Sequence, residues 1–226
     1  MEQTVIILQH KPSIPTDDLL STFAKNRVTG IKLRPNNVDE LPSEKLINKS
    51  SAMVLVDIPA RNNPRLHEEE IKLVKIFQNE KKFLALGTGT ITAGIAHGAK
   101  ICSGHLRLGW MPAAPTNHVS GQLEKSFRKI LVNSNIKLTP PEEAKILLTS
   151  GKHVAAYKHN NLLSLDFITN IDLTSYDLII QKAISQKVSP SPLVQTVEEL
   201  RYYRDKYLKP YQAEISNLLE HWLAKI

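Results

Sequence analysis

The stretch that decides the fold is Phe83-Leu84-Ala85-Leu86-Gly87-Thr88-Gly89-Thr90, which continues through Ile91 to His97 and then into Gly98-Ala99-Lys100-Ile101. Its first four residues are a short continuous apolar run, as in a strand buried on both faces of a parallel sheet. The two glycines after the run predict a tight turn. The whole stretch therefore predicts a strand, a turn, a short helix and a return to strand.

Two earlier apolar runs, residues 5–8 and 52–56, are of the same kind as the run at 83–86. Helical patterns separate the three runs, and their apolar positions are Leu19, Leu20, Phe23, Leu66, Leu73, Val74 and Phe77. The order β-α-β-α-β with right-handed crossovers predicts an α/β fold, a doubly wound and mostly parallel sheet with helices on both faces.

The second half of the chain has weaker patterns. Residues 154–157 and 162–167 flank a polar tetrad at 158–161, which predicts a β-hairpin. A further helical face is expected from Leu123, Phe127, Ile130 and Leu131. The run Ser189-Pro190-Ser191-Pro192 breaks the chain before a C-terminal helix whose apolar face is Ile215, Leu218, Leu219, Trp222, Leu223 and Ile226. We therefore divide the chain into a domain at 1–188 and a C-terminal helical extension, 189–226, packed on that domain.

Composition narrows the class of protein. The net charge is +7, but the basic residues alternate with acidic ones, so a solvated basic surface is expected and no specific nucleic-acid partner. No apolar run approaches the length of a membrane span, and the N-terminus does not resemble a signal peptide. The chain has one cysteine. These features predict a cytoplasmic protein without a membrane partner. The histidines lack the spacing of metal ligands, so no metal site is expected, and no cofactor is expected either.

The turn at 87–90 is the first place to look for a ligand, because ligands of doubly wound sheets lie at the carboxyl ends of the strands. The backbone amides of Thr88, Gly89 and Thr90 would suit an anion at the start of the helix. The turn lacks the third glycine of a dinucleotide fingerprint and the lysine of a phosphate loop. An unrelated nucleotide- or flavin-binding module is therefore the least favoured interpretation.

The chain resembles the class I glutamine amidotransferases, in particular the stand-alone members similar to GMP synthase. Leu8-Gln9-His10 matches the Gln-His at the end of the family's opening strand, and residues 85–101 match its block from nucleophile elbow to next strand. Leu108-Gly109-Trp110 and residues 165–170 match two later motifs. The resemblance covers about residues 4–180 and implies a flavodoxin-like fold.

The same matches imply that the family's chemistry is lost. The reaction needs a thiolate nucleophile, a histidine base, an acid that orients the base, and backbone donors for the oxyanion. The matching positions are Gly87, Ile168, Asn170 and the turn Asp57-Ile58-Pro59. We therefore expect a catalytically inactive, glutamine amidotransferase-like binding or regulatory module. A small molecule would bind at the former glutamine pocket through Gly87, Thr88, Gly89, Thr90 and Asp57, and a synthase or other pathway protein is the expected partner.

Cys102 is the alternative nucleophile. Ile101-Cys102-Ser103-Gly104-His105 repeats the family's nucleophile string, and an active amidotransferase or hydrolase could use this thiol, or a threonine at 88 or 90. The distance in sequence from the turn that ends at Pro59 matches the family's spacing better for Gly87 than for Cys102, so it favours Gly87 as the nucleophile elbow. The alignment then makes a geometric prediction: Gly87 lies at the turn with a positive φ, Ile168 and Asn170 lie over it, and Cys102 lies elsewhere.

Overall fold

The computed structural model describes residues 3–11, 15–59, 62–116, 129–185, 187, 189–224 and 226. The elements of the first half are β1 (Gln3–Leu8), α1 (Asp17–Lys25), β2 (Val28–Leu33), η1 (Val38–Glu40), α2 (Glu44–Lys49), β3 (Ala52–Leu55), α3 (Pro64–Glu80), β4 (Lys82–Leu86) and α4 (Gly89–Ala96). Those of the second half are β5 (Lys100–Pro112), β6 (Ala114–Pro115), β7 (Lys129–Thr139), β8 (Lys145–Ser150), β9 (His153–His159), β10 (Leu162–Leu165), α6 (Leu173–Ser185) and α7 (Val197–Leu223).

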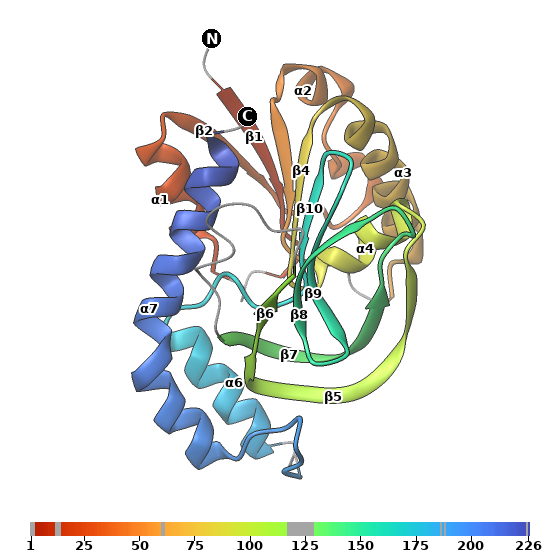
Figure 1. The fold of residues 1–226 in the computed structure, drawn as a ribbon. Helices are drawn as coiled ribbons and strands as arrows, with labels where there is room; N and C mark the ends of the chain where they lie inside the picture. Colours follow the sequence, from red (N-terminus) through yellow and green to blue (C-terminus); the bar gives the residue numbers. More distant parts are fainter. Residues whose placement is uncertain are drawn as a thin grey trace.

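Within the described residues, eight strands form one sheet in the order β2-β1-β3-β4-β10-β9-β8-β6. The pairs from β2 to β10 are parallel and the pairs from β10 to β6 are antiparallel. In Figure 1, α1, α6 and α7 lie on one side of the sheet and α2 and α3 on the other. The predicted flavodoxin-like, doubly wound α/β fold is confirmed, as is the hairpin of β9 and β10.

The hydrophobic core has two parts because side chains alternate across a strand. Val5 and Ile7 of β1 pack in a cluster with α1, α6 and α7, whereas Ile6 and Leu8 pack in a second cluster with α3 and α4. All four side chains are fully buried. A strand buried on both faces therefore appears in the sequence as a continuous apolar run.

Three features differ from the sequence-based expectations. The β-α-β-α-β order omits β2, because this edge strand contains Gly30 and is only partly buried, so it has no continuous apolar run. The predicted helical face at Leu123–Leu131 is wrong at its end, since Ile130 and Leu131 belong to β7. Leu123 and Phe127 lie outside the described residues. Helix α6 was also missed.

The C-terminal helix α7 is longer than its apolar pattern predicts. It begins at a capping box, in which Thr196 Oγ1 accepts from the Glu199 N–H and Glu199 accepts from the Thr196 N–H, and it continues past Pro210. Its buried face joins the same hydrophobic cluster as α1 and β1. One of its side chains, Tyr211, extends to the loop after β10 and so contributes to the region described below.

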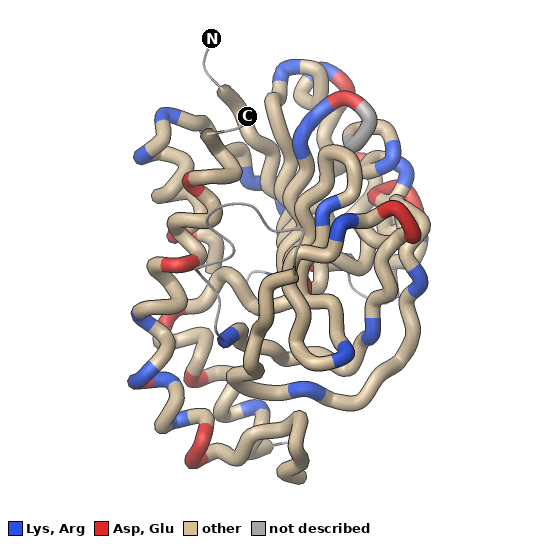
Figure 2. Tube along the Cα trace, in the orientation of Figure 1, with Lys and Arg blue, Asp and Glu red and all other residues tan. Residues whose placement is uncertain are grey.

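Charged side chains are distributed over the molecule. Figure 2 shows Lys and Arg on most elements, with Asp and Glu between them on α3 and α7. Arg204 on α7, for example, donates to Asp177 and to its neighbour Asp205. In this view the positive charge is not concentrated on one element, which agrees with a solvated basic surface.

Candidate ligand site at the strand-to-helix elbow

Gly87 forms the elbow between β4 and α4. Its φ of +53° lies in the left-handed region that favours glycine. Its N–H donates to the Leu165 carbonyl at 2.9 Å, at the end of the paired strand β10. Gly87 therefore lies at the carboxyl ends of two adjacent parallel strands, as the geometric prediction requires.

Ile168 comes to the elbow from the chain that leaves β10. Its N–H donates to the Leu131 carbonyl of β7 at 2.9 Å, and its own carbonyl accepts from the Tyr211 hydroxyl at 2.6 Å. These two hydrogen bonds hold the backbone of Ile168 between β7 and α7. The position expected for the catalytic base is thus well anchored, but it carries an aliphatic side chain.

Gly87, Ile168 and Asn170 line one cavity of about 310 Å³, which we call the elbow cavity. This volume is at the lower end of the range for small-molecule sites. The other lining residues are Lys11, Pro15, Val56, Leu86, Thr88, Asn133, Thr169, Ile171, Ser175, Leu178, Ile179 and Lys182. The geometric prediction for Gly87, Ile168 and Asn170 is confirmed, whereas their role in ligand binding stays a prediction.

Two residues that line the elbow cavity each have a polar side-chain atom without a hydrogen-bond partner among the described residues. These atoms are Oγ1 of Thr88 and Nδ2 of Asn170, and both are buried. Asn170 as a whole is only 8% exposed. A buried amide or hydroxyl without a partner costs about 1–3 kcal/mol, so such groups are rare unless something binds them.

A smaller cavity of about 60 Å³ adjoins the elbow and shares Gly87, Thr88, Asn133 and Ile168 with the elbow cavity. Asp166 lines it. His153 Nε2 lies 2.9 Å from Asp166 Oδ2, and the Arg107 guanidinium lies 3.8 Å from the same oxygen. The charge of Asp166 therefore already has a permanent counterion in Arg107.

The other residues expected to bind a ligand have structural contacts. Thr90 donates both its N–H and its hydroxyl to the Gly87 carbonyl, so its amide does not face an anion. Gly89 is a close-packing position, because a Cβ there would lie 2.4 Å from the Leu55 carbonyl oxygen. Of the expected residues, Gly87 and Thr88 line the elbow cavity and Thr90 lines the smaller one, while Gly89 and Asp57 line neither.

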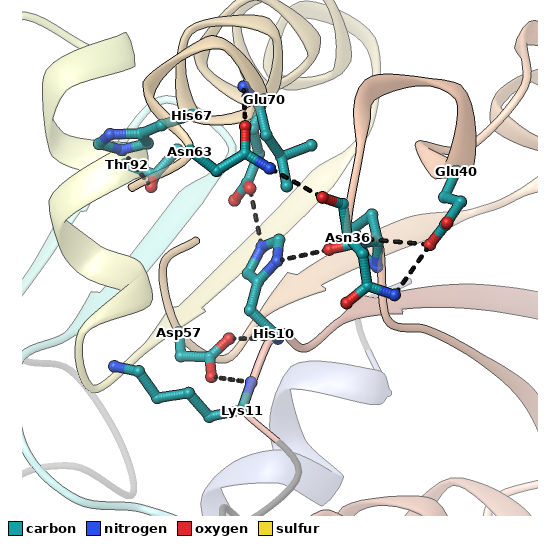
Figure 3. Close-up of polar contacts among 11 residues, drawn as sticks. His10, Lys11, Asn36, Glu40, Asp57, Asn63, His67, Glu70 and Thr92 are labelled. Carbon is teal, nitrogen blue, oxygen red and sulfur yellow. Dashed lines mark hydrogen bonds and ion pairs between the residues drawn. The ribbon is translucent and has the colours of Figure 1, made fainter. Parts of the chain in front are cut away.

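Asp57 instead anchors the loop after β1. It is fully buried, and its two carboxylate oxygens accept from the N–H groups of His10 and Lys11, both at 2.7 Å. Figure 3 shows these two contacts at the ends of the neighbouring strands β1 and β3. Since Lys11 lines the elbow cavity, Asp57 fixes the backbone of one cavity residue rather than contacting the cavity itself.

His10 belongs to the same buried network, which we call the His10 cluster: His10, Asp57 and Glu70 (Figure 3). His10 Nε2 lies 2.8 Å from Glu70 Oε2, and Nδ1 lies 3.2 Å from the Pro35 carbonyl oxygen. Both ring nitrogens thus face acceptors, which is the arrangement of a doubly protonated imidazolium. The side chains of His10 and Glu70 are 5% and 0% exposed.

The protonation of the cluster follows from burial and from these contacts. Burial lowers the pKa of His10, but the hydrogen bond and the charge of Glu70 outweigh it, so the pKa is raised from its usual value. Burial raises the pKa of Glu70, against the opposing effect of His10. On the same side of the cluster, burial and the charge of His10 lower the pKa of His67, whose Nε2 lies 3.0 Å from Thr92 Oγ1.

Cys102 lies away from the elbow. It is exposed on β5, where it pairs with Lys137 of β7, and its Sγ is 3.7 Å from the Lys137 carbonyl oxygen. It lines neither of the two cavities at the elbow. Because this is the chain's only cysteine, no thiol is available at Gly87.

Other kinds of site find little support in the described part of the chain. None of its histidines lines either cavity. It contains no group of three or more His, Cys, Asp or Glu side chains arranged to hold a metal ion. None of its helices is both long and apolar enough to cross a membrane.

Several residues of the region were not singled out from the sequence. Lys11, Asn133 and Lys182 come from three distant segments and meet only in the folded chain. The ion pair of His10 with Glu70 spans 60 positions. No local motif indicates such pairs. The one available signal is Glu70, a charged residue among the buried positions of α3.

Comparison with known proteins gave likenesses of structure only. No protein-family model matches the sequence, and no curated protein matches it. Among solved structures, a glutamine amidotransferase from Thermotoga maritima is 15% identical, with a TM-score of 0.74 over 97% of this chain and 99% of that one. A glutamine amido transferase from Methylobacillus flagellatus is 18% identical, with a TM-score of 0.76 over 99% and 93% of the two chains.

A third structure, a putative GMP synthase subunit from Thermoplasma acidophilum, is 12% identical, with a TM-score of 0.60 over 83% of this chain and 96% of that one. At these identities the likeness shows the fold alone. The chain has the fold of the glutamine amidotransferases, as its sequence resemblance predicted. The first two likenesses also cover nearly the whole chain, whereas the sequence resemblance ended near residue 180.

Proposed function

We propose that this chain is a glutamine amidotransferase-like protein that binds a small molecule at the elbow and does not hydrolyse glutamine. The observation that carries the proposal is Gly87 at the elbow with Ile168 beside it in the same cavity. A glycine cannot attack an amide carbon, and an isoleucine cannot accept or deliver a proton. The fold is kept while the groups for the reaction are replaced.

The shape of the elbow supports binding as the remaining role. Gly87 has a positive φ, and two residues that line the cavity beside it, Thr88 and Asn170, each have a buried polar atom that the described residues leave without a partner. Groups of this kind suit recognition of a ligand, since they contribute free energy only when a partner is bound. A synthase or other pathway protein is the partner we propose, and the single cysteine favours the cytoplasm.

The test is the release of ammonia from glutamine by the purified protein. We expect no release above a heat-killed control, for the wild type and for Cys102→Ala alike. Measurable turnover that disappears in Cys102→Ala would overturn the proposal, because it would identify Cys102 as a nucleophile. Turnover that persists in Cys102→Ala would overturn it equally, with a threonine of the elbow as the next candidate.

A further inference from the structure

We propose that the elbow cavity binds a small organic carboxylate with an apolar body and no ammonium group. This inference rests on the proposed function and names the class of ligand. It is carried by three features of the cavity: the charge of its lining, the two unpartnered polar atoms, and the apolar wall. Each feature excludes a different class of molecule.

The charge of the lining favours an anion. Lys11 and Lys182 both line the cavity, both are exposed, and no described hydrogen bond or ion pair engages their ammonium groups. The described lining contains no Asp, Glu or Arg. The two lysines come from the loop after β1 and from α6, so the fold brings two positive charges to the same opening from opposite ends of the sequence.

The unpartnered atoms lie deeper than the lysines. Asn170 Nδ2 is a donor, and Thr88 Oγ1 can donate or accept. A carboxylate can accept from the amide, the hydroxyl and a lysine together, because it offers two oxygens with two lone pairs each. A neutral apolar ligand would leave both buried atoms unsatisfied.

The apolar wall sets the rest of the ligand. Ile168, Ile171 and Ile179 line the cavity together with Val56, Leu86 and Leu178. Burial of apolar ligand atoms against such side chains contributes about 25 cal/mol for each Å² removed from water. Phosphate esters are a poorer match, since the lining has no arginine fork and the Thr90 amide at the start of α4 is already bonded to the Gly87 carbonyl.

An amino acid is disfavoured for a separate reason. Its ammonium group needs a carboxylate, and none lines the described cavity. Asp166 lines the smaller cavity and already faces Arg107 and His153, and Asp172, next to the lining residue Ile171, accepts from the Ser175 N–H. A bound ammonium group would therefore lose its water without gaining a free counterion. Ile168, at the position expected for the base, adds an aliphatic side chain and no polar group to the lining of the cavity.

The experiment is isothermal titration calorimetry with four probes: 4-methylpentanoate, L-leucine, 4-methylpentanamide and L-glutamine. L-leucine is 4-methylpentanoate with an added ammonium group, and 4-methylpentanamide is a neutral analogue of similar shape, so each pair differs by one charged group. We expect 4-methylpentanoate to bind about tenfold more tightly than each of the other three, since one charge-assisted hydrogen bond is worth at least that factor.

Variants locate the binding site. Asn170→Leu should raise the Kd for 4-methylpentanoate about tenfold, because leucine is similar in size to asparagine but lacks its buried hydrogen-bond donor. Lys11→Gln and Lys182→Gln should each raise the Kd about two- to fivefold, the range for exposed charges. Lys75→Gln is the matched control, since Lys75 is an exposed lysine of α3 that does not line the cavity.

Three results would overturn the inference. They are L-leucine or L-glutamine binding as tightly as 4-methylpentanoate, equal binding of the neutral amide, and no binding of any probe up to about 10 mM, a limit that corresponds to almost no specific affinity. These outcomes are separate from the proposed absence of glutaminase activity. Ammonia release would overturn the proposed function even if 4-methylpentanoate bound as expected.

Discussion

The elbow cavity and the His10 cluster lie at the same edge of the sheet, but they use polar groups in opposite ways. In the His10 cluster, His10 and Asp57 have their polar atoms engaged by Glu70, the Pro35 carbonyl and backbone amides. At the elbow cavity, Asn170 Nδ2 and Thr88 Oγ1 have no hydrogen-bond partner in the described part of the chain. In the His10 cluster the one unpartnered side-chain atom, Glu70 Oε1, belongs to a carboxylate already paired with His10, whereas the unpartnered groups of the elbow cavity are neutral.

The difference shows where acid–base chemistry is possible. The one described histidine with a raised pKa, His10, is tied to a buried glutamate and does not line the elbow cavity. A general base must reach the proton that it moves. We therefore expect substitutions in the His10 cluster to change the stability of the protein, and substitutions at the elbow cavity to change ligand binding.

The largest effect is expected from Glu70→Ala. This change leaves the His10 imidazolium buried without its partner, which costs about 3–5 kcal/mol in the free energy of unfolding. Chemical denaturation measures it. Glu69→Ala is the matched control on the same helix, because Glu69 pairs with Lys72 at the exposed surface and should contribute less than about 1 kcal/mol. Equal losses in the two variants would contradict a buried charged pair.

Gly89→Ala should come next. The added Cβ would lie 2.4 Å from the Leu55 carbonyl oxygen, so α4 must move away from β3, at a cost of about 1–3 kcal/mol. Gly98→Ala serves as a control, because Gly98 has a positive φ but nothing lies within 4 Å of its Cβ position. Thermal denaturation compares the two variants. A larger loss of stability in Gly98→Ala than in Gly89→Ala would contradict the view that close packing against β3 requires a glycine at position 89.

The pH dependence of stability should show a smaller effect of the His10 cluster. The folded-state pKa of His10 is raised above its usual value of 6.5, so its stabilising contribution is complete below 6.5 and is lost as the pH rises through the folded-state pKa. The raised pKa values of Glu70 and Asp57 act in the same direction. His67, with a lowered pKa, acts in the opposite direction on the acidic side.

The difference in unfolding free energy between the wild type and His10→Gln measures the contribution of His10 together with its effect on the pKa values of Glu70, Asp57 and His67. We expect the difference to shrink as the pH rises from about 6 to about 9, a range that begins just below the usual histidine pKa of 6.5 and ends about 2.5 units above it. A difference that grows over this range would mean that His10 is neutral in the folded protein.

How much the sequence predicts depends on how local the signal is. The continuous apolar runs of β1, β3 and β4 predict a doubly wound sheet, because burial on both faces leaves no polar position in the run. The half-exposed edge strand β2 lacks such a run and was missed. Likewise, Ile130 and Leu131 fit a helical spacing but pair as strand residues with β5, a contact that local periodicity does not report.

The site shows the same limit. The spacing of family motifs placed Gly87, Ile168 and Asn170 in one cavity, because those motifs lie at strand ends that the fold brings together. It assigned Asp57 to a ligand, whereas Asp57 accepts two backbone amides. A carboxylate after a strand looks the same in sequence whether it faces a ligand or anchors a loop.

The smallest effect on stability, and the sharpest test of the comparison, is expected from Gly87→Cys. A Cβ at this position would lie 3.7 Å from the Val56 carbonyl oxygen and 3.9 Å from that of Phe167, so the side chain fits. The φ of +53° costs a non-glycine residue about 1 kcal/mol. The variant should therefore fold, with its new thiol at the position that the sequence resemblance predicts for the nucleophile.

We expect this variant to release no ammonia from glutamine. With Ile168 in the position expected for the base, nothing described in the cavity acts as a general base for the thiol. The pH dependence of its reaction with iodoacetamide measures how far the lysines of the lining alone lower the thiol pKa. Cys102→Ser/Gly87→Cys removes the exposed native thiol from that measurement. Robust glutaminase activity in Gly87→Cys alone would mean that a base does reach the elbow, and that the separation between a charged structural cluster and a neutral binding cavity is wrong.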